Sequence, residues 1–291
     1  MSEMKNYIFA KNIYDLDELV EIDWLPEFEE IMDYNIKNKL GLDLVVHGSY
    51  GDFTYNNFSD LELTVIFNKP YNKIDKKSAI NIINRKIHKL CITVDPLQHH
   101  GPFFITSKDI LCYKPKSLPL EAYQSCWSLR DVNIKFHLKN TDSEFEEISK
   151  WRYRKTIDAL REPKKSFFKH GKNLYSIKRM LSNFFMIPVY SANANGMRIE
   201  KREAIEQAAN IFPDYFIMAL KCGTDIRSSW PKKNNLLSYI RKKIVRDRIP
   251  QGNFDLVSTK FFREKIIEHK IEEDFLPLLN KAVKEIEWRH Q

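Results

Sequence analysis

No stretch of the sequence approaches the ~20 uninterrupted apolar residues that a membrane-spanning helix needs. The N-terminus also lacks the basic and then apolar layout of a secretory signal, because Glu3, Asp15, Asp17 and Glu18 are acidic. These two absences predict a protein without a membrane span and favour a cytoplasmic location over secretion.

Cysteine is scarce, and the few cysteines are far apart. The chain has four, with no CxxC pair among them: Cys91, Cys112, Cys126 and Cys222. This spacing suggests neither a zinc cage nor a disulfide framework. We therefore expect reduced thiols.

Hydrophobic residues are plentiful even though long runs of them are missing. They make up 43% of 291 residues, and aromatic residues make up 13%. That content is enough to bury the core of one large domain or two ordinary ones. No fixed period of self-similarity is present, which excludes a repeat array.

The N-terminal part of the chain predicts a small domain that mixes helices and strands. Pro26 in a first turn and Gly41 as a stop bound the first helix. Alternating or fully apolar segments indicate the strands. The predicted elements are a helix over 25–40, strands over 42–46 and 60–67, a helix over 76–90, and strands over 91–97 and 132–138.

The pattern changes to helices alone after residue 143. Five or six helices are expected, separated by breaks near Pro163, residues 191–196, Pro213, Pro231 and residues 250–253. Ser143 is predicted to cap the first of them. The fold class is therefore α+β, with a mixed-sheet domain over residues 1–140 and an all-helical domain over residues 141–291.

The positive charge is concentrated in the second of these domains. Residues 1–140 carry 17 Lys and Arg against 19 Asp and Glu, whereas residues 141–291 carry 30 against 20. The densest segment, 150–179, holds 11 basic residues and two acidic ones. Such a cluster can hold phosphates or polyanions, although a solvated helix face has the same composition.

The residues that carry chemistry lie between 45 and 66. A predicted strand ends in Gly48-Ser49, and the next begins with Asp60-Leu61-Glu62. Alternation places the two carboxylates on one face of that strand, where they repel each other unless cations lie between them. Asp95, at the end of another predicted strand, is a candidate third carboxylate for a site with two divalent ions.

Gly48-Ser49 and the segment Ser59 to Leu63 resemble the signature of the DNA polymerase β-like nucleotidyltransferase superfamily. The resemblance implies a palm-like catalytic domain over residues 1–140. It implies that Gly48 and Ser49 hold the triphosphate of a nucleotide. It further implies that Asp60, Glu62 and Asp95 are catalytic and bind two Mg²⁺ ions, with Mn²⁺ as an alternative. Many members have Asp-x-Asp here, whereas Asp-x-Glu occurs among bacterial aminoglycoside nucleotidyltransferases.

The helical half resembles the C-terminal region of the same bacterial enzymes more faintly, over residues 174–180 and 198–216. The resemblance implies that lysines such as Lys172 and Lys178 reach the nucleotide phosphates. Tyr175 is a candidate for stacking on the base, with a place in the core as the alternative. His99 and His100 are interpreted as a substrate contact, a support for Asp95 or a polar strand end, and not as metal ligands.

The function predicted from these features is transfer of a nucleoside monophosphate from a nucleoside triphosphate to a hydroxyl, with release of pyrophosphate. The basic domain favours a nucleotide, oligonucleotide or nucleic acid, or a protein hydroxyl, as acceptor. A nucleic-acid signal in bacterial antiphage defence is one such product. An aminoglycoside nucleotidyltransferase and a non-catalytic nucleic-acid-binding module are the alternatives. The existence of a homo-oligomer is left open.

Overall fold

The computed structural model describes residues 7–16, 22–67, 74–98, 100–113, 120–136, 142–169, 171–232 and 264–289. These residues form two compact units, the first up to residue 136 and the second over 142–232 and 264–289. The fold class is α+β, as predicted. The predicted boundary between residues 140 and 141 and the predicted site residue His99 lie outside the described residues.

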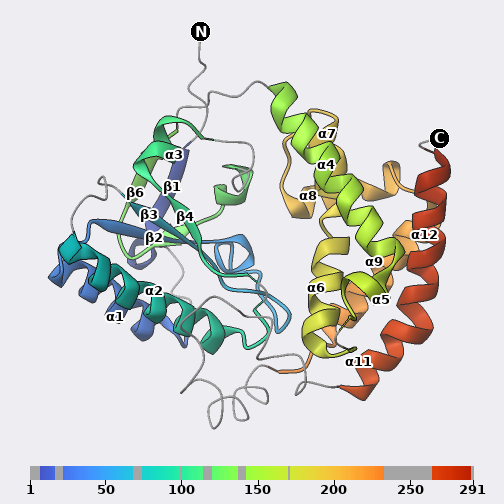
Figure 1. The fold of residues 1–291 in the computed structure, drawn as a ribbon, viewed down its shortest axis with the longest axis horizontal. Coiled ribbons are helices and arrows are strands. Elements are labelled where there is room, and N and C mark those ends of the chain that lie inside the picture. The colour runs from blue at the N-terminus through green and yellow to red at the C-terminus, as the bar shows by residue number, and fades with distance from the viewer. Residues whose placement is uncertain are drawn as a thin grey trace. The chain divides into compact units, whose positions relative to one another are not determined.

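A six-stranded mixed sheet forms the centre of the first unit (Figure 1). Its strand order is β4-β3-β2-β5-β1-β6, with β2 antiparallel to β3 and β4 parallel to β3. The strands are β1 (Tyr7–Asn12), β2 (Leu42–His47), β3 (Glu62–Phe67), β4 (Phe103–Ile105), β5 (Trp127–Ser128) and β6 (Val132–Lys135). The central position of β2 and β3 explains why both segments are apolar on two faces.

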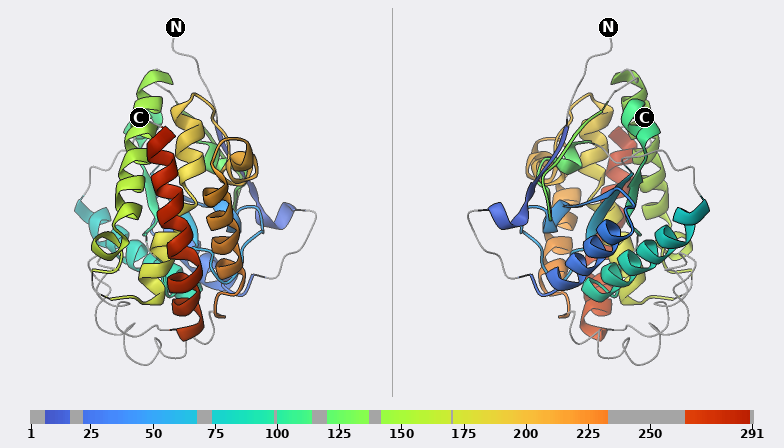
Figure 2. Two further views of the ribbon diagram at one scale, coloured as in Figure 1. Left: turned by 90° about the vertical axis from the view of Figure 1, so that its right-hand side faces the viewer. Right: turned by 90° about the vertical axis from the view of Figure 1, so that its left-hand side faces the viewer.

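Two helices, α1 (Leu25–Lys37) and α2 (Ile74–Val94), lie side by side on one face of this sheet (Figures 1 and 2). Leu44 and Val46 of β2 pack in the core beneath these helices, whereas Val45 packs in a second core on the opposite face. Shorter elements complete the unit: α3 (Ser107–Leu111) and the 3₁₀ turns η1 (Ile13–Asp15), η2 (Gly48–Tyr50) and η3 (Leu120–Tyr123).

The predicted strand over 91–97 is wrong, because Cys91–Val94 forms the last turn of α2. The buried residues Ile83, Ile87, Leu90, Cys91 and Val94 recur at helical spacing, so this apolar segment continues one face of the helix. A proline at position 96 follows the helix end. The strand that pairs with β3 on this side is instead β4, which was not predicted; nor were β1 and β5.

The second unit is helical, and its described part has more and shorter helices than the five or six predicted. They are α4 (Asp142–Arg161), α5 (Pro163–Ser166), α6 (Leu174–Phe184), α7 (Ile187–Ala194), α8 (Lys201–Glu206), η4 (Gln207–Asn210), α9 (Asp214–Ser228), α11 (Lys265–His269), a π-helical turn η6 (Lys270–Phe275) and α12 (Leu276–Arg289). The predicted cap Ser143 lies inside α4, which begins one residue earlier. Helix α12 packs against α4 and α9 (Figure 2).

Aromatic side chains fill the core of the helical unit. The Phe184 ring lies 5.0 Å from that of Phe216 and 5.2 Å from that of Phe275. Helix α6 is buried almost all round, as is typical of a central helix. None of the described helices has both the length and the apolar character to cross a membrane.

Candidate active site

The turn after β2 requires glycine at two positions. Gly48 has a φ of +65°, and a Cβ atom there would lie 1.9 Å from Oε2 of Glu62. A Cβ atom on Gly51 would lie 2.2 Å from the carbonyl oxygen of Ser125. Residues 48–50 form the 3₁₀ turn η2, and the first N–H groups of such a turn have no partner within it. The predicted phosphate-binding pair Gly48-Ser49 thus begins a turn that packs against Glu62.

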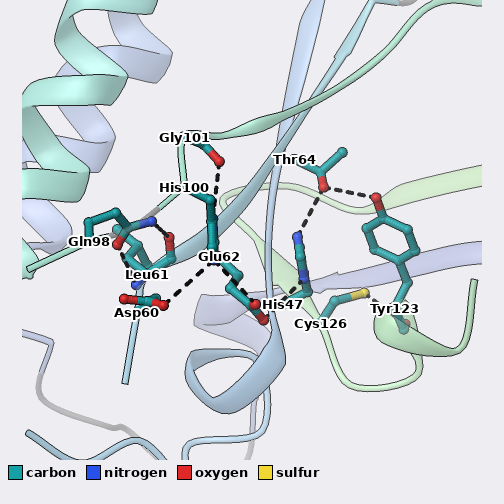
Figure 3. A network of polar contacts seen from close by, with 10 residues as sticks. All are labelled: His47, Asp60, Leu61, Glu62, Thr64, Gln98, His100, Gly101, Tyr123 and Cys126. Atoms are coloured by element: carbon teal, nitrogen blue, oxygen red, sulfur yellow. Dashed lines mark hydrogen bonds and ion pairs between the residues drawn. The ribbon is translucent and has the colours of Figure 1, made fainter. Parts of the chain in front are cut away.

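Asp60 and Glu62 come together at the start of β3. The sheet register pairs Glu62 with His47, whereas Asp60 precedes the strand. The buried Gln98 holds the residue between the two acids, because its Oε1 accepts the Leu61 N–H at 3.0 Å and its Nε2 donates to the Leu61 carbonyl at 2.9 Å (Figure 3). The predicted strand start at Asp60 is two residues early, because β3 begins at Glu62.

His100 faces both carboxylates, which sequence reasoning did not foresee. Its Nε2 lies 3.7 Å from Oδ2 of Asp60 and 3.7 Å from Oε1 of Glu62 (Figure 3). Its Nδ1 lies 3.2 Å from the carbonyl oxygen of Gly101. The only signal in the sequence was a histidine beside a Gly-Pro turn, a few residues after Asp95.

His47 lies on the other side of Glu62 and was also missed. Its Nδ1 is 3.8 Å from Oε2 of Glu62, and its Nε2 is 3.0 Å from the hydroxyl of Thr64. That hydroxyl lies 2.9 Å from the hydroxyl of Tyr123. Burial lowers the pKa of His47 to about 4, although the charge of Glu62 acts in the opposite direction. The imidazole is therefore neutral at pH 7.

Asp95 is buried beside the same cluster, with 1% of its surface exposed. It follows α2, and its Oδ1 accepts the Leu97 N–H at 3.1 Å. Burial raises the pKa of Tyr50 above its usual range, and the charges of Asp95 and Asp60 both add to this shift. The charges of Asp95 and Asp60 therefore both act on Tyr50. Among the described residues, no group of three or more His, Cys, Asp or Glu side chains could hold a metal ion.

The nucleotide-binding candidates of the helical unit lie on or before α6. Lys172 forms an ion pair with Glu272 of η6. Tyr175 and Lys178 are buried, with 4% and 0% of their surfaces exposed. Burial of Tyr175 matches the core alternative stated for it. The part of all three residues in nucleotide binding stays a prediction.

Ion pairs with acidic side chains neutralise part of the positive charge of segment 150–179. Lys150, Arg161 and Lys165 each form an ion pair with an acid three residues earlier, namely Glu147, Asp158 and Glu162. Such exposed pairs contribute little to stability, about 0–1 kcal/mol each. They lower the net positive charge that this segment presents.

The sequence matches no known protein-family model and no curated protein. A solved structure with some likeness is the spectinomycin adenyltransferase from Enterococcus faecialis, crystallised with ATP and spectinomycin. The sequence identity is 12% and the TM-score 0.33, with 90% of this chain and 98% of the other covered. A TM-score of this size does not establish a shared fold.

Proposed function

We propose that this protein is a metal-dependent nucleotidyltransferase that moves a nucleoside monophosphate from a nucleoside triphosphate to a hydroxyl group and releases pyrophosphate. The observation that supports this function is the contact between Gly48 and Glu62. It joins a 3₁₀ turn, whose first N–H groups have no partner within the turn, to a pair of carboxylates suited to cations. The resemblance of these same residues to the nucleotidyltransferase signature points in the same direction.

The donor set fits divalent cations, because carboxylate oxygens are the ligands that Mg²⁺ prefers in proteins. Asp60 and Glu62 would hold such ions. When bound, two of them lower the pKa of the attacking hydroxyl and neutralise charge on the leaving oxygens. The 48–50 turn would orient the triphosphate through its backbone N–H groups, assisted by the Ser49 hydroxyl.

Asp95 has a supporting part in this proposal. Its carboxylate is almost completely buried, and one of its oxygens already accepts a backbone N–H. The charges of Asp95 and Asp60 both act on Tyr50. Asp95 therefore adds to the negative potential that attracts cations to this site. The predicted role of Asp95 as a direct ligand is not needed for this proposal.

The charge of the helical region favours an anionic acceptor. Residues 141–291 carry ten more basic than acidic residues, as 30 against 20. A pocket for a polycationic aminoglycoside is expected to gather carboxylates instead. A nucleotide or oligonucleotide hydroxyl is therefore the acceptor that we expect.

The test is incubation of the purified full chain with each ribo- and deoxyribonucleoside triphosphate and either Mg²⁺ or Mn²⁺. Single-stranded oligonucleotides, free nucleotides and aminoglycosides are offered in parallel as acceptors, and products are resolved by mass while pyrophosphate is measured. We expect pyrophosphate and a nucleotide adduct of an anionic acceptor, both lost in Asp60→Asn. Adducts of aminoglycosides alone would reverse the acceptor assignment, and the absence of pyrophosphate under all conditions would remove the proposed activity.

A further inference from the structure

His47 and Glu62 lie opposite each other on the neighbouring strands β2 and β3. The sheet register pairs the two residues directly, so their side chains project from the same face. The His47 side chain is fully buried, whereas that of Glu62 is one-third exposed. Oε2 of Glu62 lies 3.8 Å from Nδ1 of His47. One oxygen of a partly exposed carboxylate is therefore close to a buried ring nitrogen.

The His47 ring is held by a hydrogen bond and by packing. Its Nε2 lies 3.0 Å from the hydroxyl of Thr64, a buried residue that is its diagonal neighbour in the sheet. The centroid of the ring lies 5.0 Å from that of Tyr123 and 5.7 Å from that of Phe103. A ring fixed at Nε2 and packed against two aromatic rings has little freedom to turn. The fold therefore sets the direction of Nδ1.

The Thr64 hydroxyl connects His47 to Tyr123 (Figure 3). It lies 2.9 Å from the Tyr123 hydroxyl. Burial raises the pKa of Tyr123 above its usual range, so this phenol keeps its proton at neutral pH and can donate it. A hydroxyl group has one donor and two acceptor positions, so Thr64 can accept from Tyr123 while it donates to Nε2 of His47.

The other ring nitrogen of His47 faces the carboxylate. Among the described residues, Nδ1 of His47 is buried and has no hydrogen-bond partner. Buried polar atoms are almost always paired, so an exception requires a physical explanation. A carboxylate oxygen only accepts hydrogen bonds, and Nδ1 complements it when Nδ1 carries the single proton of the neutral ring. In that tautomer Nε2 accepts from Thr64, and each donor along the chain of side chains faces an acceptor.

We propose that His47 is a positioning residue whose Nδ1–H holds Oε2 of Glu62. Thr64 and Tyr123 fix the tautomer that this contact requires. The inference deepens the proposed function, on which it rests for the part that Glu62 plays in nucleotide transfer. The distance of 3.8 Å is longer than a hydrogen bond, so a small rotation of the partly exposed Glu62 side chain completes the contact. Gly48 permits this arrangement, because its missing side chain leaves the space that Oε2 occupies.

A fixed carboxylate oxygen has a measurable effect on catalysis. A free glutamate side chain samples several rotamers, and a hydrogen bond to one oxygen reduces their number. Misplacement of a catalytic group by about 1 Å can lower the rate about 100-fold. Loss of the contact is therefore expected to lower kcat. KM for the triphosphate should stay the same, because the 48–50 turn is unchanged.

The first test identifies the protonated nitrogen of His47 by long-range ¹H–¹⁵N spectra of the full chain at pH 7, without nucleotide or metal. The chain has eight histidines, and the His47 signals are assigned by their absence in His47→Gln. We expect one tautomer, with the proton on Nδ1. The resonance of this proton should move upfield in Glu62→Ala, because the hydrogen-bond acceptor is lost.

Thr64→Val tests the hydroxyl chain, because it keeps the shape of the side chain and removes the hydroxyl group. The His47 ring should then populate both tautomers, and kcat for nucleotide transfer should fall about 10- to 100-fold with KM unchanged. Thr64→Ser returns a hydroxyl group and should restore the tautomer and kcat. Should Thr64→Val fail to fold, Glu62→Ala still decides the contact, since the Glu62 side chain is one-third exposed.

Ser128→Ala is the matched control. It removes another buried hydroxyl group of the same sheet, which donates to the Leu44 carbonyl at 2.6 Å. The loss of stability should be comparable, whereas the His47 tautomer and kcat should be those of the parent.

The outcomes separate this inference from the proposed function. A proton on Nε2 of His47 in the parent, or an Nδ1 proton that does not respond to Glu62→Ala, would overturn the contact. Parent-level kcat in Thr64→Val, or no rescue by Thr64→Ser, would overturn the positioning role. Nucleotide transfer by a protein with the proton on Nε2 would leave the proposed function in place. The expected spectra from a protein that transfers no nucleotide would remove the proposed function and leave the contact between His47 and Glu62.

Discussion

Gly48 and Glu62 are in such close contact that a single added carbon on residue 48 would lie 1.9 Å from the Glu62 carboxylate. Gly48 begins the turn after β2, and Glu62 begins the neighbouring strand β3. The turn and the Glu62 carboxylate therefore pack directly against each other. A substitution at either residue is expected to shift the other.

Gly48→Ala is expected to abolish nucleotide transfer, because the new methyl group displaces Glu62. The matched control is Gly171→Ala, since Gly171 also has a positive φ but its added Cβ would meet no atom within 4 Å. Both variants should lose about 1–2 kcal/mol of stability from backbone strain. Only Gly48→Ala should lose activity, by more than about 100-fold. Denaturant unfolding and pyrophosphate release measure the two effects, and full activity in Gly48→Ala would contradict the assignment.

Asp60→Asn and Glu62→Gln should each abolish transfer while the fold is kept. Each removes one negative charge from a crowded site, so the melting temperature without metal should stay the same or rise. The stabilisation that Mg²⁺ or Mn²⁺ gives the parent should disappear. Thermal melts with and without metal, together with transfer assays, test this prediction. Metal-dependent activity at the parent level in either variant would rule out these ligands.

The buried His47 should make the protein sensitive to mild acid. Its pKa is lowered to about 4 from an ordinary 6.5, so the unfolded chain binds a proton there before the folded protein does. The free energy of unfolding therefore falls as the pH drops from 6.5 to 4, by up to about 3 kcal/mol, and this contribution is constant above pH 6.5. Denaturant unfolding at several pH values should show this component in the parent and not in His47→Gln. Identical pH dependence in both proteins would contradict it.

Charge reversal of Lys164 and Lys165, both exposed on α5, should weaken binding to single-stranded oligonucleotides. Affinity of the parent should fall steeply with salt, and each lost phosphate contact should reduce the slope of log K against log salt by about 0.7. The control reverses the exposed Lys265 and Lys284 in the same unit. Fluorescence anisotropy over a salt series measures the slopes. Equal slopes for the parent and both variants would show that α5 does not contact the oligonucleotide.

The local sequence was sufficient to predict those elements whose hydrophobic pattern lies within a few helical turns or a single strand. The predicted helix over 25–40 and strand over 42–46 correspond to α1 and β2. The apolar segment after residue 90 was misassigned as a strand, because a short apolar run does not distinguish a strand from the buried end of a long helix. Only its continuity with Ile83 and Ile87 on one helix face decides between them.

The sequence by itself determined the α+β class and placed Gly48, Asp60 and Glu62 near one another, since Gly48 follows the end of β2 and the two acids lie at the start of the next strand along the chain. Only the tertiary structure placed His47 and His100 on either side of Glu62. The physical reason is distance along the chain. Gln98 contacts Leu61 across 37 residues, and Tyr123 contacts Thr64 across 59. Contacts of that separation depend on how the whole sheet packs, and no local pattern encodes them.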